Sequence, residues 1–168
     1  MKNYYIPYLN YITVNLKNNK TFEVNITFKS GSKKLKDHPK YEFLNNRVGQ
    51  QLFKQQLIKV QKKSLFDSYK SSSMFEAAHI KPFSKCEENE KYDTSNGLLL
   101  EPDIHRLYDK NLINFKITGD KRIEILFSES ISDYDKELLL NRLGSKITSH
   151  KIENMDEKMQ KYLLERSI

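Results

Sequence analysis

The chain has 168 residues, the length of one domain, of which 38% are apolar and 30% are charged. It has no apolar run near the roughly 18 residues of a membrane span and no signal-peptide core at its start, so we expect a cytoplasmic protein with no membrane partner. Its single cysteine, Cys86, excludes an internal disulfide and a structural zinc site built on several cysteines.

The net charge of +7 is concentrated in the first half of the chain. Residues 1–80 hold 14 Lys and Arg against 5 Asp and Glu, whereas residues 81–168 hold 15 against 17. A basic half suits a polyanionic partner, because contacts with phosphates gain affinity by releasing counterions. Ordinary solvated lysines would give the same balance, so the charge alone leaves both interpretations open.

The first 30 residues predict two strands joined as a β-hairpin. Apolar and polar residues alternate there with a period of two, around a turn signal at Asn18-Asn19. The alternating apolar residues are Val14, Leu16, Phe22, Val24, Ile26 and Phe28. A basic loop over residues 30–36, closed by Pro39, follows; it either touches a DNA backbone or is a solvated connection.

The middle of the chain changes from a helical to a strand-like pattern. One apolar face over residues 50–63 predicts a helix. Short strands are predicted over residues 75–80 and 98–100, with a polar loop between them. Pro102 and Asp103 then suit the start of a helix, with Asp103 near the N-cap.

The C-terminal tail is predicted to be helical. Ser132 with Asp135 resembles a capping box, and Gly144 is a typical helix stop. A last amphipathic helix is predicted over about residues 155–165. Together with the predicted strands, these helices indicate an α+β fold.

Two of the four histidines have surroundings that suggest chemistry. His38 and His150 are most simply ordinary surface residues. His79 ends a predicted strand and His105 lies near a predicted helix start, with Asn96 in the turn between. A strand, a loop, a second strand and a helix would bring these three side chains around one phosphate. Two histidines and an asparagine are weak evidence by themselves.

The segments around these residues resemble the HNH endonuclease family. The similar segments are Ala77-Ala78-His79-Ile80-Lys81-Pro82, Asn96-Gly97-Leu98-Leu99-Leu100 and Asp103-Ile104-His105-Arg106-Leu107-Tyr108-Asp109. They are most similar to the subgroup found in restriction-type nucleases, and Arg47-Val48-Gly49-Gln50 with Phe53 resembles its lead-in helix. The resemblance implies an HNH nuclease domain over 43–168 with a ββα-metal core at about 74–115. Residues 1–42 would then be an N-terminal β-hairpin and basic extension.

The resemblance also implies a role for each matching residue. His79 would be the general base that takes a proton from the attacking water, a task for which an imidazole pKa of about 6.5 is suited. Asn96 would brace the loop and orient this base. His105 would bind a divalent metal ion through a neutral ring nitrogen. One ion suffices when a histidine supplies the base; Mg²⁺ or Mn²⁺ is expected, and Zn²⁺ fits the same ligands.

The chain departs from the family pattern at Ala78, where many members have an Asp or His as the second metal ligand. Asp103, two residues before His105, is the first candidate to replace it, although a plain N-cap would explain it equally well. Asp109 is the alternative, because it lies four residues after His105 on the same helix face; a salt bridge is its simpler explanation. Glu76 is a more distant candidate.

The implied activity is hydrolysis of DNA, expected to be double-stranded, in a restriction or DNA-defence role. Lys81, Lys85 and Arg106 are candidate phosphate contacts, though each is also an ordinary surface charge. An HNH-fold module that binds DNA without cutting it is the main alternative, since a fold does not fix a function. A nuclease toxin would use the same chemistry. A homodimer would suit cleavage of both strands of a symmetric site, but the sequence demonstrates none.

Overall fold

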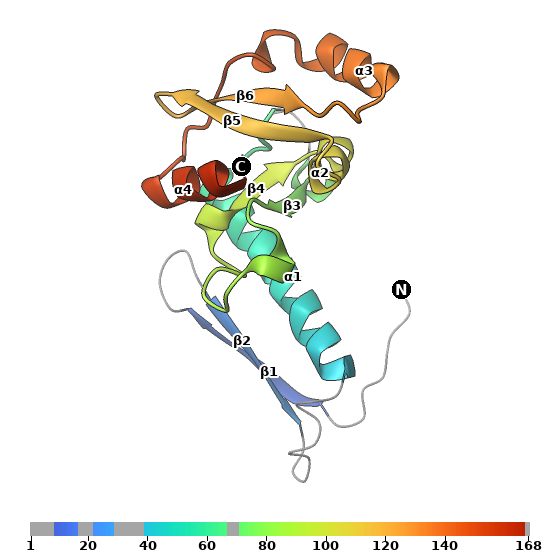
Figure 1. The fold of residues 1–168 in the computed structure, drawn as a ribbon. Coiled ribbons are helices and arrows are strands. Elements are labelled where there is room, and N and C mark those ends of the chain that lie inside the picture. The colour runs from blue at the N-terminus through green and yellow to red at the C-terminus, as the bar shows by residue number, and fades with distance from the viewer. Residues whose placement is uncertain (1–8, 17–21, 29–38, 67–70, 167–168) are drawn as a thin grey trace.

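The structure is a computed structural model that describes residues 9–16, 22–28, 39–66 and 71–166 (Figure 1). In these ranges the chain mixes helices with short antiparallel strands, which confirms the predicted α+β class. The elements in chain order are β1 (Leu9–Leu16), β2 (Phe22–Phe28), α1 (Pro39–Gln61), β3 (Glu76–His79), β4 (Gly97–Leu100), α2 (Pro102–Asp109), β5 (Ile113–Gly119), β6 (Arg122–Phe127), α3 (Asp133–Leu143), β7 (His150–Lys151) and α4 (Glu157–Arg166).

The first sheet pairs β1 with β2 and lies along α1 (Figure 1). The turn expected at Asn18-Asn19 and the basic loop expected over 30–36 lie outside the described residues. The boundary predicted between residues 42 and 43 falls inside α1. Pro39, expected to close the basic loop, is the first residue of α1, a position that suits proline because its missing N–H has no helical partner to lose.

The second sheet pairs β3 with β4, and β4 is buried on both faces. Phe53 and Leu57 of α1 pack with Leu99 on one face, whereas Leu98 and Leu100 join the larger core on the other. Burial on both sides explains why β4 is a continuous apolar run without alternation. The sheet thus fixes α1 and α2 on opposite sides of the strand that ends in His79.

Gly97 allows the close approach of α1 to this sheet. A Cβ atom at this position would lie 2.5 Å from Cζ of Phe53 and under 3.0 Å from both Leu57 methyl groups. Real Cβ atoms essentially never have such contacts. The glycine that the sequence marks as a turn signal therefore also determines the packing of the helix behind the site.

The prediction of a helical C-terminal tail misses three strands. Residues after α2 form the hairpin β5–β6, and β7 joins it as a third strand. Ile113 and Phe115 face the core, as do Ile123 and Ile125 opposite them. This period-two pattern is typical of strands, but it is short and lies in a mostly polar stretch. The helical part of the prediction holds for α3 and α4.

The ends of α3 are capped as the sequence predicts. The Ser132 hydroxyl accepts a hydrogen bond from the Asp135 backbone N–H at 3.1 Å, and Gly144 follows the helix with a φ of 53°. This positive φ favours glycine, which has no Cβ to clash. Among the helices that the structure describes, none has both the length and the apolar character needed to cross a membrane.

Candidate active site

His79 lies at the end of β3, opposite Gly97 of β4, with only 7% of its surface exposed. Its ring stacks on Phe53 of α1 with the centroids 4.5 Å apart, and the Phe83 ring meets it edge-on at 5.4 Å. These aromatic neighbours fix the orientation of the imidazole. They also keep most of the ring away from solvent.

A single hydrogen bond determines the tautomer of His79. Its Nε2 lies 2.7 Å from the backbone carbonyl oxygen of Lys91. A carbonyl oxygen only accepts hydrogen bonds, so Nε2 carries the proton and Nδ1 carries a lone pair. Among the described residues, no hydrogen-bond partner occupies Nδ1. The ring is thus held by Nε2, and its basic nitrogen has no partner among the described residues.

Burial lowers the pKa of His79 below its ordinary value of 6.5. The hydrogen bond to Lys91 and the charge of Asp109 oppose this shift, while His105 adds to it. Asp109 and His105 both belong to α2, which packs against β3. His79 is therefore neutral at neutral pH, the state that accepts a proton.

Asn96 is completely buried and ties together the loop between β3 and β4. Its side-chain oxygen accepts a hydrogen bond from the Lys81 N–H at 2.8 Å. Its amide nitrogen donates to the Glu90 carbonyl and to Sγ of Cys86, both at 3.2 Å. Since Glu90 directly precedes the residue whose carbonyl holds His79, the amide stabilises the support of the imidazole.

Replacing Asn96 with alanine is expected to lower the free energy of unfolding by about 1–3 kcal/mol, because buried backbone groups lose their partners. Urea unfolding monitored by circular dichroism measures this change. Asn141→Ala, at an exposed position on α3, is the matched control and should be nearly neutral. Equal stability of the two variants would contradict the bracing role.

His105 lies between two carboxylates. Its Nδ1 is 2.7 Å from Oε2 of Glu76 on β3, and its Nε2 is 3.2 Å from Oδ2 of Asp109 on α2. Asp109 reaches the ring because it lies one helical turn further along α2. Glu76 reaches it because the outer face of β3 packs against this helix. Both carboxylates are at least half exposed, so the cluster is open to solvent.

The first candidate for the second metal ligand, Asp103, is not part of this cluster. It forms an ion pair with Arg142 of α3. Two residues along a helix correspond to a rotation of roughly 200°, which directs Asp103 away from His105. Asp103 is also not the N-cap, which is Glu101. Ala78 is buried in the core, so its position cannot supply a ligand either.

The chemistry of the cluster fits a divalent cation. One imidazole and two carboxylates are ligands that Mg²⁺, Mn²⁺ and Zn²⁺ accept. Among the described residues, the side chains do not form a ready-made three-ligand group, because each carboxylate contacts a different nitrogen of His105. One carboxylate with His105 would hold an ion, and the other would orient the ring from behind.

Comparison with known families identifies the same part of the chain. Residues 55–116, from the second half of α1 to β5, match the family model described as HNH endonuclease. These residues form an HNH endonuclease domain. The family resemblance predicted from the sequence is confirmed, and it indicates a nuclease that acts on nucleic acid. No curated protein matches the chain.

Arg166, the last residue of α4, links the two elements that carry the histidines of the HNH domain. Its guanidinium donates hydrogen bonds to the carbonyls of His79 and Ile80 at 3.2 and 2.8 Å. It also donates to the Tyr108 carbonyl at 2.7 Å and to the Asn111 side chain at 3.3 Å, while lying 3.7 Å above the Tyr108 ring. This side chain therefore ties the end of β3 to the end of α2.

Replacing Arg166 with lysine is expected to slow cleavage at saturating DNA by about 10- to 100-fold, because misplacement of catalytic groups by an ångström has effects of this size. Lysine keeps the charge but lacks the planar fork that reaches two elements at once. Arg142→Lys, on α3, is the matched control. The result to measure is the rate at saturating DNA for both variants, at a temperature where each is folded.

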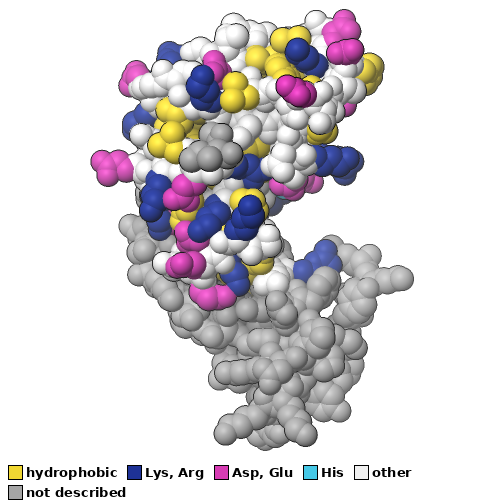
Figure 2. Space-filling view, in the orientation of Figure 1, with side chains coloured by type: hydrophobic (Ala, Val, Ile, Leu, Met, Phe, Trp, Pro, Cys, Tyr) yellow, Lys and Arg dark blue, Asp and Glu magenta, His cyan; other side chains and the backbone are white. Residues whose placement is uncertain are grey.

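The three candidate phosphate contacts differ in their surroundings. Lys81 forms an ion pair with Glu90 at 2.5 Å inside the loop, which makes it a weaker candidate. Lys85 and Arg106 are exposed, and neither has an ion-pair partner among the described residues. On the face shown in Figure 2, basic and acidic side chains are intermixed, so the described residues form no continuous basic surface there.

Proposed function

We propose that this protein is a metal-dependent DNA endonuclease that cleaves double-stranded DNA, in a restriction or DNA-defence role. The observation that carries the proposal is the state of His79: neutral, rigidly held, and with a free lone pair on Nδ1. The nearby His105 cluster supplies ligands for a cation. A base and a cation site, here on the packed elements β3 and α2, are the two parts that hydrolysis of a phosphodiester requires.

The proposed reaction begins with a water molecule at Nδ1 of His79. As its oxygen bonds to phosphorus, one of its protons passes to Nδ1, and the bond from phosphorus to the 3′ oxygen breaks. The 3′ oxygen takes a proton from solvent, and His79 later returns its own proton to solvent. The products are a 5′ phosphate and a 3′ hydroxyl. The Lys91 carbonyl stabilises the imidazolium that forms in between.

His105 with Asp109 or Glu76 would hold the divalent ion, Mg²⁺ or Mn²⁺. When bound, such an ion stabilises negative charge on the phosphate and on the leaving oxygen. Phosphate contacts by Lys85 and Arg106 would position the DNA backbone. These contacts depend little on sequence, so they leave the choice of target to other parts of the chain.

The proposal is tested by incubating the protein with supercoiled plasmid in EDTA, in Mg²⁺ and in Mn²⁺. We expect nicked or linear product with a metal ion and none in EDTA. Discrete fragments would support a restriction role, and a smear would point to an unspecific nuclease. Absence of cleavage with every ion, on methylated and unmethylated plasmids, would contradict the proposal.

An HNH domain that binds DNA without cleaving it is the second candidate. The observation in its favour is Ala78, whose buried side chain leaves a position without the ligand that many family members have. This candidate predicts a mobility shift of DNA that needs no metal, together with intact plasmid in every condition. The plasmid experiment therefore separates the two candidates directly.

Cleavage is expected to fall in acid with an apparent pKa below 6.5. Burial lowers the pKa of His79, so the neutral base persists below the ordinary value and is lost only as the pH falls further. The measurement is kcat/KM between about pH 5 and 8 with the metal ion saturating. A midpoint above 6.5 would show that His79 does not set the acid limb.

A further inference from the structure

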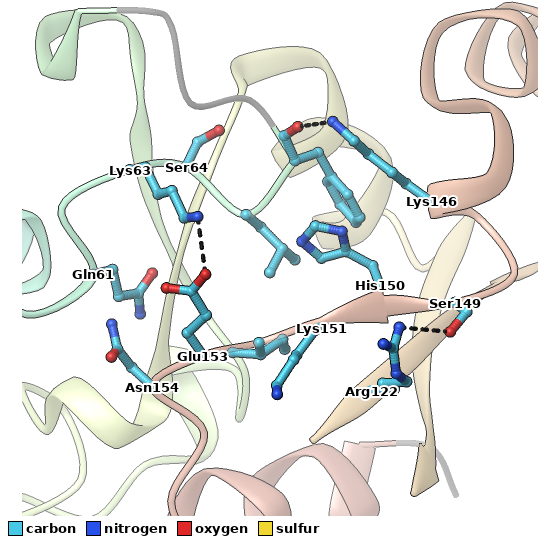
Figure 3. A pocket seen from close by; sticks show the side chains of 13 residues that line it. Gln61, Lys63, Ser64, Arg122, Lys146, Ser149, His150, Lys151, Glu153 and Asn154 are labelled. Atoms are coloured by element: carbon cyan, nitrogen blue, oxygen red, sulfur yellow. Dashed lines mark hydrogen bonds and ion pairs between the residues drawn. The ribbon is translucent and has the colours of Figure 1, made fainter. Parts of the chain in front are cut away.

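A cavity of about 350 Å³ that is lined by basic side chains lies away from His79 and His105 (Figure 3). Its walls come from the segment after α1, from the start of β6 and from residues 146–154. The segment after α1 runs along β4: the N–H of Leu99 donates to the Gln61 side chain, and its carbonyl accepts from Leu65. The cavity and β3 with His79 thus lie on opposite sides of β4.

Four cationic side chains and one carboxylate, Glu153, line this cavity. With His150 neutral, the lining therefore has three positive charges in excess. The cationic residues are Lys63, Arg122, Lys146 and Lys151. Figure 3 shows them distributed around the cavity. Positive charges gathered in a concave surface produce a stronger local potential than the same charges spread over a flat one.

The contacts of these cations leave most of their charge uncompensated. Only Lys63 has a carboxylate partner among the described residues, Glu153 at 3.3 Å. Arg122 donates to the Ser149 hydroxyl at 3.1 Å, and Lys146 donates to the Phe66 carbonyl at 2.6 Å. Neutral oxygens of this kind hold a cation in place without cancelling its charge. The two side chains are therefore ordered in advance for an anion.

An aromatic pair completes the cavity. The His150 ring is half-buried and lies 4.9 Å from the Phe66 ring, centroid to centroid. Burial lowers the pKa of His150, and the charges of Lys146, Lys63 and Arg122 contribute to this shift. The ring thus experiences the positive potential of the cavity. Phe66 is only 3% exposed, so it supports the His150 ring from the core and offers little surface of its own.

From this arrangement we infer that the cavity binds phosphate groups of a nucleic-acid strand, as a second contact separate from the site of cleavage. The inference rests on the proposed function, since it gives the enzyme a further hold on its substrate. The cavity lies at the small end of the roughly 300–1,000 Å³ range for organic ligands, so it has room for a nucleotide unit and not merely a bare ion. Lysine and arginine side chains gathered on one concave surface are the groups through which proteins contact the phosphate backbone.

The test uses Arg122→Gln with Lys151→Gln, because both side chains are exposed and neither packs in the core. Binding of a fluorescent 20-base-pair duplex is measured in EDTA over a series of salt concentrations. We expect affinity to fall by about 5- to 30-fold and the slope of log affinity against log salt to decrease by about 1–2, as for the loss of one or two phosphate contacts. Lys136→Gln with Lys161→Gln removes the same charge from α3 and α4 as a control.

Two results would overturn the inference. One is equal affinity of the cavity variant and the control variant, with thermal unfolding showing that both are folded. The other is displacement of the duplex by inorganic phosphate at the same concentration of phosphate groups, which would indicate a site for small anions only. Binding is measured in EDTA, where no cleavage is expected, so this test does not depend on whether the protein cleaves DNA. Intact plasmid with normal duplex binding would instead count against the proposed function alone.

Discussion

The His79→Ala variant is expected to cleave DNA about 100- to 10,000-fold more slowly than the wild type, the range that a positioned general base contributes. The side chain holds its proton on Nε2, against the Lys91 carbonyl, and offers Nδ1 to the attacking water. Alanine has no side-chain nitrogen, so the variant loses the proposed base. Affinity for DNA should change little, because a buried neutral ring makes no phosphate contact. Single-turnover cleavage at saturating DNA measures the effect.

A matched variant separates chemistry from folding in this experiment. His79→Gln can keep an amide donor near the position of Nε2 for the Lys91 carbonyl but has no basic nitrogen, so it should be as inactive as alanine while retaining more stability. Added imidazole should partly restore the alanine variant, because it can occupy the space between Phe53 and Phe83. Cleavage within threefold of the wild type by either variant would assign the base to another group.

Local sequence patterns were sufficient to place the three candidate residues on their elements. His79, Asn96 and His105 lie in short segments with strand, turn and helix signals, and the structure has each on the predicted element or beside it. Their proposed roles come from the family resemblance and stay predictions. The buried amide of Asn96 contacts only groups within 15 residues of itself. Interactions of such short range are determined by neighbouring residues, so they can be predicted without knowledge of the whole fold.

The choice between carboxylates could not be made in the same way. Asp103 and Asp109 both lie near His105 in the sequence, and the helix period alone favours Asp109. What decides the matter for Asp103 is Arg142, whose position depends on the hairpin β5–β6 and the helix α3 after it. Glu76 was a more distant candidate because its contact with His105 requires β3 and α2 to pack together.

Arg166 had no sequence signal at all. It lies in an amphipathic helix of alternating charges, where a solvated arginine is the ordinary expectation. Only the fold brings α4 against the end of β3, where four hydrogen bonds replace water around the guanidinium. The short strands β5, β6 and β7 are hard to predict from the sequence for the same reason, since their pairing partners lie in other segments of a polar region. Elements of this kind depend on tertiary packing more than on propensity.

The carboxylates around His105 lead to the second large expected effect. Asp109→Asn and Glu76→Gln should each lower the apparent affinity for Mn²⁺ and the cleavage rate by about 10- to 100-fold. This is the loss found when a carboxylate that supports a metal ligand is removed. Both changes keep the size of the side chain and remove only its negative charge. The measurements are isothermal titration with Mn²⁺ and the cleavage rate as a function of metal concentration.

Asp103→Asn is the matched control for this experiment, since it makes the same change on the same helix but loses only an exposed ion pair with Arg142, a contact worth little in water. It should bind Mn²⁺ and cleave DNA much like the wild type. If excess metal restores Asp109→Asn but not Glu76→Gln, Asp109 is the ligand and Glu76 instead orients the His105 ring through Nδ1. The reverse pattern exchanges the two roles. A large loss in Asp103→Asn alone would show that the ion is held at the start of α2, contrary to the cluster around His105.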